Sequence, residues 1–221
     1  MRLNENTVIC GDKVILVPYR SVLIILKTYH DWMKSPELLE LTASEPLSLE
    51  EEYDMQRKWH TDEDKLTFIL LARSSNLPSS SHSLLNPSQL PSCRMIGDVN
   101  MFLPDGPTGD GECEIMIAAP SDRGKGFAGE ALRLFLAYAT SSLSMRPQQL
   151  IARIGRSNAP SIKLFESLGF GVSKVVEVFD EVELRWGHEP DQAESTAVTD
   201  ELGYSIPEGI IGVYDPRDGT A

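Results

Sequence analysis

Apolar and polar positions along the chain follow two periods, one of two residues and one of three to four. Apolar or alternating runs of strand length, bounded by Gly, Pro or charged residues, predict five strands, at residues 13–18, 66–71, 95–103, 112–118 and 149–155. Two further alternating runs, 172–178 and 181–186, predict a hairpin. Helical spacing follows the fourth and fifth strands.

Helix-start and helix-stop residues place the helices. Ser48 begins a capping box that opens a helix between the first two strands, and a shorter helical stretch around 36–41 precedes it. After the fourth strand, the spacing predicts a helix over 130–139. After the fifth strand, Asn158 can cap a helix that Gly169 ends.

Two stretches lack the pattern of a folded core. Residues 73–92 are rich in Ser and Pro, which predicts a flexible insertion between two strands. Residues 187–221 are acidic and rich in Gly and Pro, and we expect a mobile C-terminal tail after a domain that spans residues 1–186. A few apolar side chains of this tail, Tyr204 and Ile210 among them, are suited to docking on the domain.

Charge and cysteine content restrict the partners and the compartment. The formal net charge of −13 disfavours a phosphate backbone, so no nucleic-acid partner is expected. The first residues lack the layout of a signal peptide, and the longest apolar run, 22–26, is far shorter than the ~20 residues that span a bilayer, so no membrane partner is expected. The three cysteines and four histidines show no metal-ligand spacing, so we expect no metal and a cytoplasmic protein.

A glycine-rich loop with positive charge joins the strand at 112–118 to the next helix. Three glycines between residues 124 and 129 allow the backbone to approach a phosphate group closely, and the first N–H groups of a helix have no partner within it. Arg123 and Lys125 add positive charge. The loop is a candidate phosphate-binding site, with a glycine turn that binds no ligand as the alternative.

The same loop matches a second motif. Residues 124–129 fit G-x-G-x-x-G, the dinucleotide fingerprint of a nicotinamide oxidoreductase. That fingerprint needs an acidic residue after the next strand, where Arg156 stands, and several more strand–helix units than follow. Arg156 could instead suit a 2′-phosphate, so the small number of strand–helix units is the stronger objection to a dinucleotide.

Two carboxylates precede the loop on one strand. Glu112 and Glu114 are two residues apart, so their side chains leave the same face of the sheet, whereas Cys113 leaves the other. Burial and mutual repulsion raise the pKa of such a carboxyl toward the range in which it accepts a proton near neutral pH. We interpret the pair as candidate general bases, the alternative being ordinary acids at a solvated strand end.

Two motifs together indicate a family. Residues 123–128, Arg-Gly-Lys-Gly-Phe-Ala, are followed about thirty residues later by Asn158-x-x-Ser161-x-x-x-Phe165-x-x-x-Gly169-Phe170. This combination resembles the GNAT acetyltransferase superfamily, in its ribosomal-protein alanine acetyltransferase-like branch. The stretches 1–4, 29–35, 41–47 and 97–100 resemble the N-acetyltransferase 9 subfamily, which is described as acting on tubulin amino termini. The resemblance covers residues 1 to about 186.

The resemblance implies a fold and a cosubstrate. The GNAT acyl-CoA N-acyltransferase fold is α/β (α+β), with a mixed central sheet of about seven strands that is flanked by helices and splayed between the strands at 112–118 and 149–155. Acetyl-CoA is the implied cosubstrate. The residues implied to bind it are Met116, Ile117, Ala118, Arg123, Gly124, Lys125, Gly126, Phe127, Ala128, Gly129, Asn158, Ser161 and Phe165.

The implied function is transfer of an acetyl group to an amine of a protein or peptide, with a tubulin amino terminus as the candidate acceptor. Glu112, or Glu114 through a water, would take the proton of the amine, and a backbone N–H near Met116 or Ile117 would hold the oxyanion. Phe165 stands where many members have a tyrosine that returns a proton to the leaving thiolate, so the general acid is unassigned. This departure favours the alternative, a non-catalytic CoA-fold module that acts as a microtubule or protein-interaction factor, whereas the intact loop favours an enzyme.

Overall fold

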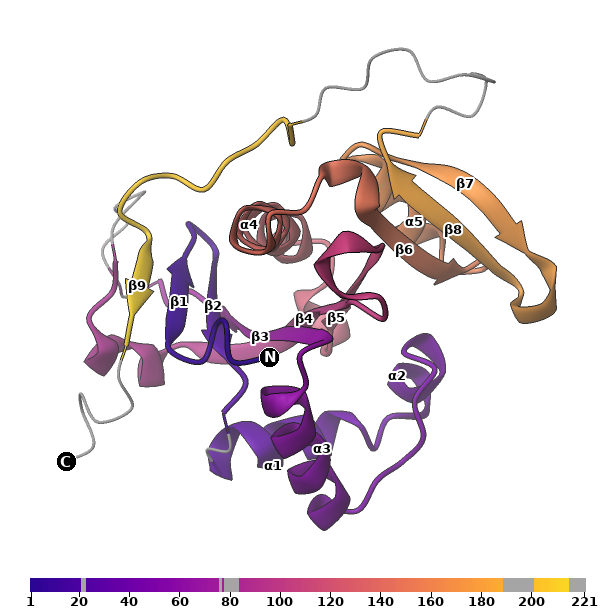
Figure 1. The fold of residues 1–221 in the computed structure, drawn as a ribbon. Helices are drawn as coiled ribbons and strands as arrows, with labels where there is room; N and C mark the ends of the chain where they lie inside the picture. Colours follow the sequence, from indigo (N-terminus) through magenta and orange to yellow (C-terminus); the bar gives the residue numbers. More distant parts are fainter. Residues whose placement is uncertain (21–22, 76, 78–83, 189–200, 215–221) are drawn as a thin grey trace.

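A mixed sheet organises the molecule, with helices on both of its faces (Figure 1). The structure is a computed structural model and describes residues 1–20, 23–75, 77, 84–188 and 201–214. Within these residues nine strands follow the order β7-β8-β6-β5-β4-β3-β2-β1-β9, and all neighbours are antiparallel except β5 and β6. The strands are β1 (Thr7–Cys10), β2 (Val14–Pro18), β3 (Lys65–Ala72), β4 (Arg94–Phe102), β5 (Gly111–Ile117), β6 (Leu150–Gly155), β7 (Phe170–Val176), β8 (Glu181–Trp186) and β9 (Ile211–Val213). The α-helices are α1 (Leu23–Trp32), α2 (Pro36–Leu41), α3 (Leu49–Thr61), α4 (Phe127–Leu143) and α5 (Ala159–Glu166).

The seven strands predicted from the pattern are β2 to β8, and the predicted mixed α/β fold is confirmed. The helix-start signals are also confirmed. The Ser48 hydroxyl accepts a hydrogen bond from the Glu51 backbone N–H, and the Glu51 carboxylate accepts one from the Ser48 N–H. Asn158 caps α5 by accepting a hydrogen bond from the Ser161 N–H.

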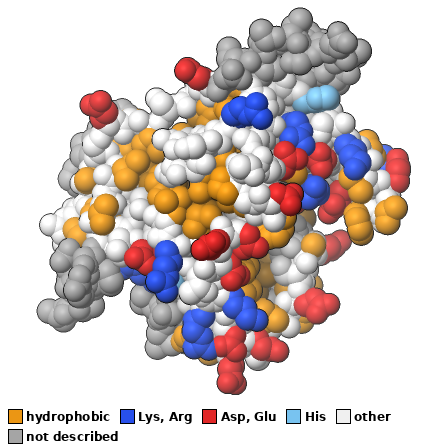
Figure 2. Space-filling model, in the orientation of Figure 1, with side chains coloured by type: hydrophobic (Ala, Val, Ile, Leu, Met, Phe, Trp, Pro, Cys, Tyr) orange, Lys and Arg blue, Asp and Glu red, His pale blue; other side chains and the backbone are white. Residues whose placement is uncertain are grey.

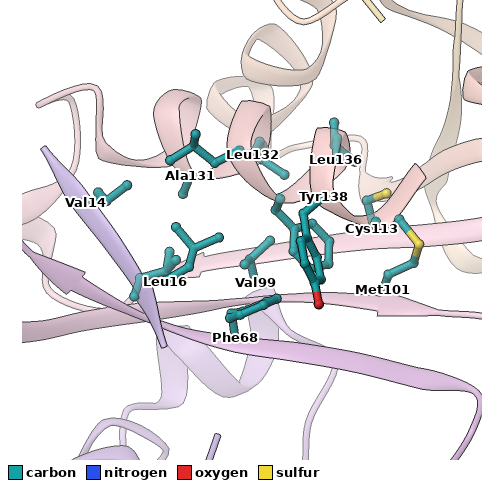
Figure 3. Close-up of a cluster of buried hydrophobic side chains, with 14 of the residues drawn as sticks. Val14, Leu16, Phe68, Val99, Met101, Cys113, Ala131, Leu132, Leu136 and Tyr138 are labelled. Carbon is teal, nitrogen blue, oxygen red and sulfur yellow. The ribbon is translucent and has the colours of Figure 1, made fainter. Parts of the chain in front are cut away.

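One face of the sheet packs against α4 and forms the core of the domain (Figure 3). Alternate residues of β2, β3, β4 and β5 point to this face, as the period of two requires. Phe68 lies edge-on to both Phe135 and Tyr138 of α4, with ring centroids 6.2 and 5.5 Å away. Cys113 is buried on this face beside Met101, which confirms that it leaves the strand opposite to its glutamate neighbours.

The other face of the sheet is covered by α1 and α3 and is more polar (Figure 1). The ring of Tyr19 lies 5.5 Å from that of Tyr29 in α1 and 6.1 Å from that of Trp59 in α3. The amide of Gln56 donates a hydrogen bond of 2.8 Å to the Tyr19 carbonyl, and Asp98 and Asn100 of β4 are buried. Buried polar groups are normally hydrogen-bonded, and Asn100 and Asp98 are joined by a hydrogen bond of 2.6 Å.

Two strands of the described sheet, β1 and β9, have no counterpart among the predictions. The expected tail began at residue 187, but β9 pairs antiparallel with β1, Ile210 is buried and Leu202, Tyr204 and Ile206 pack against the core. The sheet therefore extends beyond the expected domain boundary at residue 186. The pairing joins residues some two hundred positions apart, so no local pattern indicated it.

The expected insertion, 73–92, lies partly outside the described residues. Its end is a 3₁₀ helix, Pro87–Ser92, capped by Asn86, and Leu85 is buried, so this part has regular structure. Among the described residues, no helix has the length and apolar content needed to cross a membrane.

Between β5 and β6 the sheet opens. These parallel strands pair only at Gly111 with Leu150 and at Glu112 with Ile151. From residue 113 onward the edge of β5 that faces β6 has no strand partner among the described residues. The predicted splay between these strands is therefore confirmed.

Candidate active site

The loop that leads into α4 presents a row of backbone donors. Gly124 and Gly126 have φ angles of 75° and 81°, a left-handed conformation that residues with a Cβ rarely adopt. Gly126 is the N-cap of α4. Within the described part of the chain, the N–H groups of residues 124–129 donate no hydrogen bond. A row of unpaired donors at the positive end of a helix of seventeen residues is the arrangement that binds phosphate groups.

Asp122 anchors this loop to the sheet. Its side chain is almost fully buried and accepts two hydrogen bonds, of 2.6 and 2.8 Å, from the Arg94 guanidinium at the start of β4. The ammonium of Lys125 lies 3.3 Å from the same carboxylate. Hydrogen bonding from Arg94, supported by Lys125, holds the pKa of Asp122 below its usual value. The positive charge of Lys125 is thus partly neutralised by a carboxylate that the sequence did not single out.

The side chain of Arg123 lies against the end of β5. Its guanidinium is 2.5 Å from the Glu37 carboxylate of α2, and it donates to the backbone carbonyls of Ile117 and Ala118 at 3.2 and 3.4 Å. The sequence suggested a cation available to a phosphate, whereas the structure pairs this cation with α2. The features of the loop that suit an anion are its backbone N–H groups and the Lys13 ammonium, which donates a 3.3 Å hydrogen bond to the Lys125 carbonyl.

The residues predicted on α5 lie on the other side of the splay. Asn158 and Ser161 form its first turn, and Leu164 of the same helix is close to Gly129 of α4. Phe165 is 2% exposed, and its ring lies edge-on to Phe170 at 5.1 Å between centroids. Phe165 is thus a core residue, and its contact with a cofactor remains a prediction.

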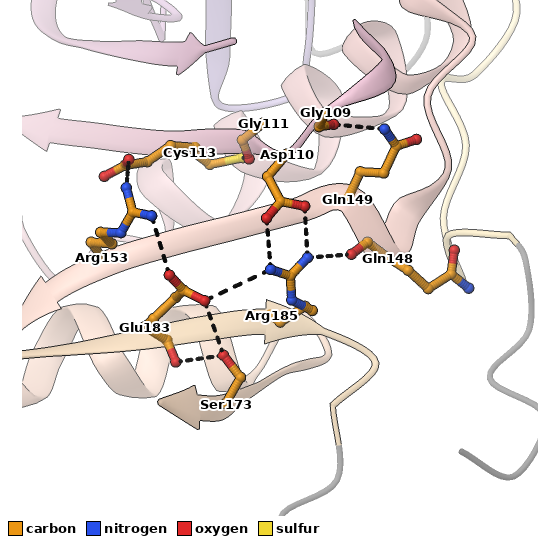
Figure 4. A network of polar contacts seen from close by, with 11 residues as sticks. Gly109, Asp110, Gly111, Cys113, Gln148, Gln149, Arg153, Ser173, Glu183 and Arg185 are labelled. Atoms are coloured by element: carbon orange, nitrogen blue, oxygen red, sulfur yellow. Dashed lines mark hydrogen bonds and ion pairs between the residues drawn. The ribbon is translucent and has the colours of Figure 1, made fainter. Parts of the chain in front are cut away.

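Glu112 lies where β5 and β6 still pair. Its partner Arg153 belongs to the network of polar contacts drawn in Figure 4. The Glu112 carboxylate is 2.5 Å from the guanidinium of Arg153 in β6, which also contacts Glu183 of β8 at 3.2 Å. Arg185 of β8 binds Asp110 with two hydrogen bonds of 2.7 and 2.8 Å. Burial raises the pKa of Glu112, and the positive charge of Arg153 opposes that effect. The network fastens the closed end of the splay.

Glu114 lies two residues further along β5, where the edge of this strand is no longer paired with β6. Its side chain is about half exposed, and its carboxylate is 3.9 Å from the ammonium of Lys65 in β3. Glu114 pairs across the strands with Asn100, whose amide donates a 2.6 Å hydrogen bond to Asp98. The structure therefore places both predicted carboxylates on the face covered by α1 and α3, and it adds Asp98 to them.

Asp98 was not predicted as a site residue, since residues 97–100 entered only as part of a resemblance. A signal was present, because Asp98 and Asn100 are polar residues at alternate positions of an otherwise apolar strand. Such a pattern normally marks a solvated face. Here both faces of the strand are covered, so the two polar side chains are buried.

A splayed β5–β6 pair, a glycine loop with unpaired N–H groups and carboxylates on one face of β5 are features typical of an acyltransferase. Comparison with protein families gives the same class: the model of the acetyltransferase (GNAT) domain matches residues 14–171. The chain belongs to the GNAT acetyltransferases and is an N-acetyltransferase. Nothing in the comparisons supports a nicotinamide enzyme or a non-catalytic module.

Individual relatives of the chain have more specific names than the family. The chain is 46% identical over 188 residues to the human alpha/beta-tubulin-N-acetyltransferase 9, covering 84% of this chain and 85% of that protein. It is 44% identical over 194 residues to the Drosophila melanogaster protein of the same name, covering 86% and 92%. Among solved structures, spermidine N-acetyltransferase from Vibrio cholerae, in complex with CoA and spermine, aligns with a TM-score of 0.62 at 19% identity, covering 79% of this chain and 94% of that one. This last similarity concerns the fold.

Proposed function

We propose that this chain is an acetyl-CoA-dependent enzyme that acetylates the amino terminus of tubulin, in the cytoplasm. The acceptor is inferred from relatives named for tubulin, which match most of this chain at 44–46% identity. The cosubstrate is inferred from the family and from the row of free N–H groups at residues 124–129, the observation that carries the proposal. Acetyl-CoA supplies an activated acetyl group and a diphosphate.

The residues present fit that cosubstrate. The N–H groups of the loop suit its diphosphate, and the unpaired edge of β5 around Met116 suits the amide-rich pantetheine arm, which can add to a sheet as an extra strand. Asn158 and Ser161 lie across the opening on α5. No described group of His, Cys, Asp or Glu side chains is arranged to hold a metal ion.

An amine must lose a proton before it can accept an acetyl group, so a base is required. Glu114 suits this role better than Glu112. Glu114 is about half exposed beside the open edge of β5, whereas Glu112 is held by Arg153 at the closed end. A backbone N–H of β5 near Met116 would stabilise the negative charge that develops on the carbonyl oxygen.

The direct test is acetylation of a synthetic tubulin amino-terminal peptide, followed by mass spectrometry. The same peptide with a blocked α-amino group is the control. We expect one acetyl group on the free peptide and none on the blocked one. Equal modification of both peptides would locate the reaction at a side chain. An enzyme that acetylates other amines but leaves this peptide unmodified would reject tubulin as the acceptor.

Cofactor binding is tested separately. Arg123→Glu places a carboxylate beside Glu37 and next to the donor row, so we expect loss of acetyl-CoA binding by calorimetry. Arg57→Glu makes the same charge change on an exposed face of α3 and should leave affinity unchanged. Unchanged affinity in Arg123→Glu would refute the phosphate-binding role of the loop.

A further inference from the structure

Asp98 is a buried carboxyl group with one unsatisfied oxygen. The residue is 3% exposed. Its Oδ2 accepts a 2.6 Å hydrogen bond from Asn100, whereas Oδ1 is buried and has no hydrogen-bond partner among the described residues. Native proteins rarely leave a buried polar atom unpaired, so each such atom needs an explanation.

The position of Asp98 relates it to the candidate base. In the β4–β5 ladder Asp98 pairs with Met116, and Asn100 pairs with Glu114. Paired residues share one face of the sheet, so Asp98 and Glu114 are diagonal neighbours, with Cβ atoms roughly 7 Å apart. A single water molecule can bridge carboxyl groups at such a separation. The half-exposed Glu114 therefore lies between the buried Asp98 of β4 and the open edge of β5.

The hydrogen-bonded surroundings fix the buried carboxyl group. Asn100 is itself held, since its amide oxygen accepts a 2.6 Å hydrogen bond from the Thr67 hydroxyl of β3. The Asn4 amide in turn donates to the Thr67 backbone carbonyl at 2.7 Å. These hydrogen bonds keep Oδ2 of Asp98 occupied and leave Oδ1 as the atom that can gain or lose a proton.

Charged and titratable groups face Asp98 from each neighbouring element. Glu114 of β5 acts to raise its pKa and Lys65 of β3 acts to lower it. Tyr19 after β2 and Tyr29 of α1 are buried nearby, and burial, with the charge of Asp98, raises the pKa of both phenols. Glu52 of α3 lies in the same layer and is 3.2 Å from His30 of α1. Burial is the largest effect and raises the pKa of Asp98 to about 7, so the group exchanges its proton near neutral pH.

We propose that Asp98 stores the proton that the acceptor amine releases during acetyl transfer, and that Glu114 passes this proton to it. The inference rests on the proposed function. Because Asp98 acts through Glu114 and does not touch the substrate, it is a positioning residue.

The protons of the reaction balance in this scheme. Acetyl transfer forms a C–N bond and breaks the C–S bond of the thioester. The acceptor arrives as an ammonium ion and loses two protons in becoming an amide. One ends on the sulfur of the CoA product, and the other passes through Glu114 to Asp98 and returns to solvent by the same route.

The test is the pH dependence of kcat, with acetyl-CoA and the tubulin amino-terminal peptide as substrates. In the wild type we expect kcat to fall below an apparent pKa near 7, since a protonated Asp98 cannot accept another proton. Asp98→Asn should remove this acidic limb and lower kcat at pH 8 by about tenfold to hundredfold, while the calorimetric affinity for acetyl-CoA stays unchanged. The asparagine retains an oxygen that can accept the hydrogen bond from Asn100.

Two further variants separate a role in proton transfer from a structural one. Glu52→Gln removes another buried carboxyl of the same layer and should retain the limb. Asp98→Glu keeps a carboxyl group and should also retain it. A wild type that binds acetyl-CoA but acetylates no amine at any pH would overturn both the proposed function and this inference. An active wild type whose kcat profile is unchanged in Asp98→Asn would overturn the inference alone.

Discussion

The free energy of unfolding should reveal the buried carboxyl of Asp98 without any substrate. The pKa of Asp98 is about 7 in the folded protein, against 3.8 for an exposed aspartate. Below pH ~4 the group is protonated in both states and causes no loss of stability. As the pH rises from ~4 to ~7, the unfolded chain releases its proton first, so the folded state becomes progressively less stable.

The size of this loss of stability follows from the difference between the folded and unfolded pKa values of Asp98. Roughly three pKa units at ~1.4 kcal/mol each give a loss of about 4 kcal/mol above pH 7, of which about 2–3 kcal/mol falls between pH 5 and pH 8. Asp98→Asn cannot titrate, so it should remove this portion of the pH dependence. The amide leaves one buried group unsatisfied at every pH, which adds a constant that cancels when the two pH values are compared.

The assay is urea unfolding of the wild type and Asp98→Asn at pH 5 and pH 8. Other titrating groups are common to both proteins, so the difference between the two pH-dependent changes isolates Asp98 and its coupling to Glu114 and Lys65. We expect the variant to gain about 2–3 kcal/mol relative to the wild type on going from pH 5 to pH 8. Parallel pH dependences in the two proteins would refute a carboxyl that titrates near neutrality.

Other substitutions test the loop, the core and the helix caps. Gly126→Ala places a residue with a Cβ at a left-handed backbone position. We expect the free energy of unfolding in urea to fall by about 1–2 kcal/mol and acetyl-CoA binding to weaken by calorimetry. Gly155→Ala, which has open space and an ordinary φ, is its matched control. Phe165→Ala should cost about 3–5 kcal/mol in the same assay, because the ring is buried against Phe170, and a near-neutral result would contradict its core placement. Ser48→Ala should cost about 1 kcal/mol through loss of the capping box, read as a lower Tm, and an unchanged Tm would mean that the cap contributes nothing.

The sequence was informative where the physics is local. Strand and helix periods, the capping box at Ser48 and the cap at Asn158 depend on neighbouring residues, and all four agree with the structure. These features needed no knowledge of distant segments.

The features that the sequence did not predict depend on contacts between distant segments. The pairing of Arg123 with Glu37 and of Arg153 with Glu112 joins residues far apart in the chain, so the sequence could indicate the charges but not their partners. The burial of Asp98 follows from α1 and α3 covering a strand face that looked suited to solvent. Such a carboxyl is recognisable only when the fold is known.

The strand β9 has a consequence for the behaviour of the chain in concentrated solution. It covers the outer edge of β1, whose four residues are all buried. Without this cover, β1 would present unpaired main-chain groups on an apolar strand, which is the kind of edge that recruits strands from other molecules and leads to aggregation. The strand of three residues, the outermost of the nine, thus leaves a shorter edge open than β1 would, and short edge strands offer less main chain for pairing with other molecules.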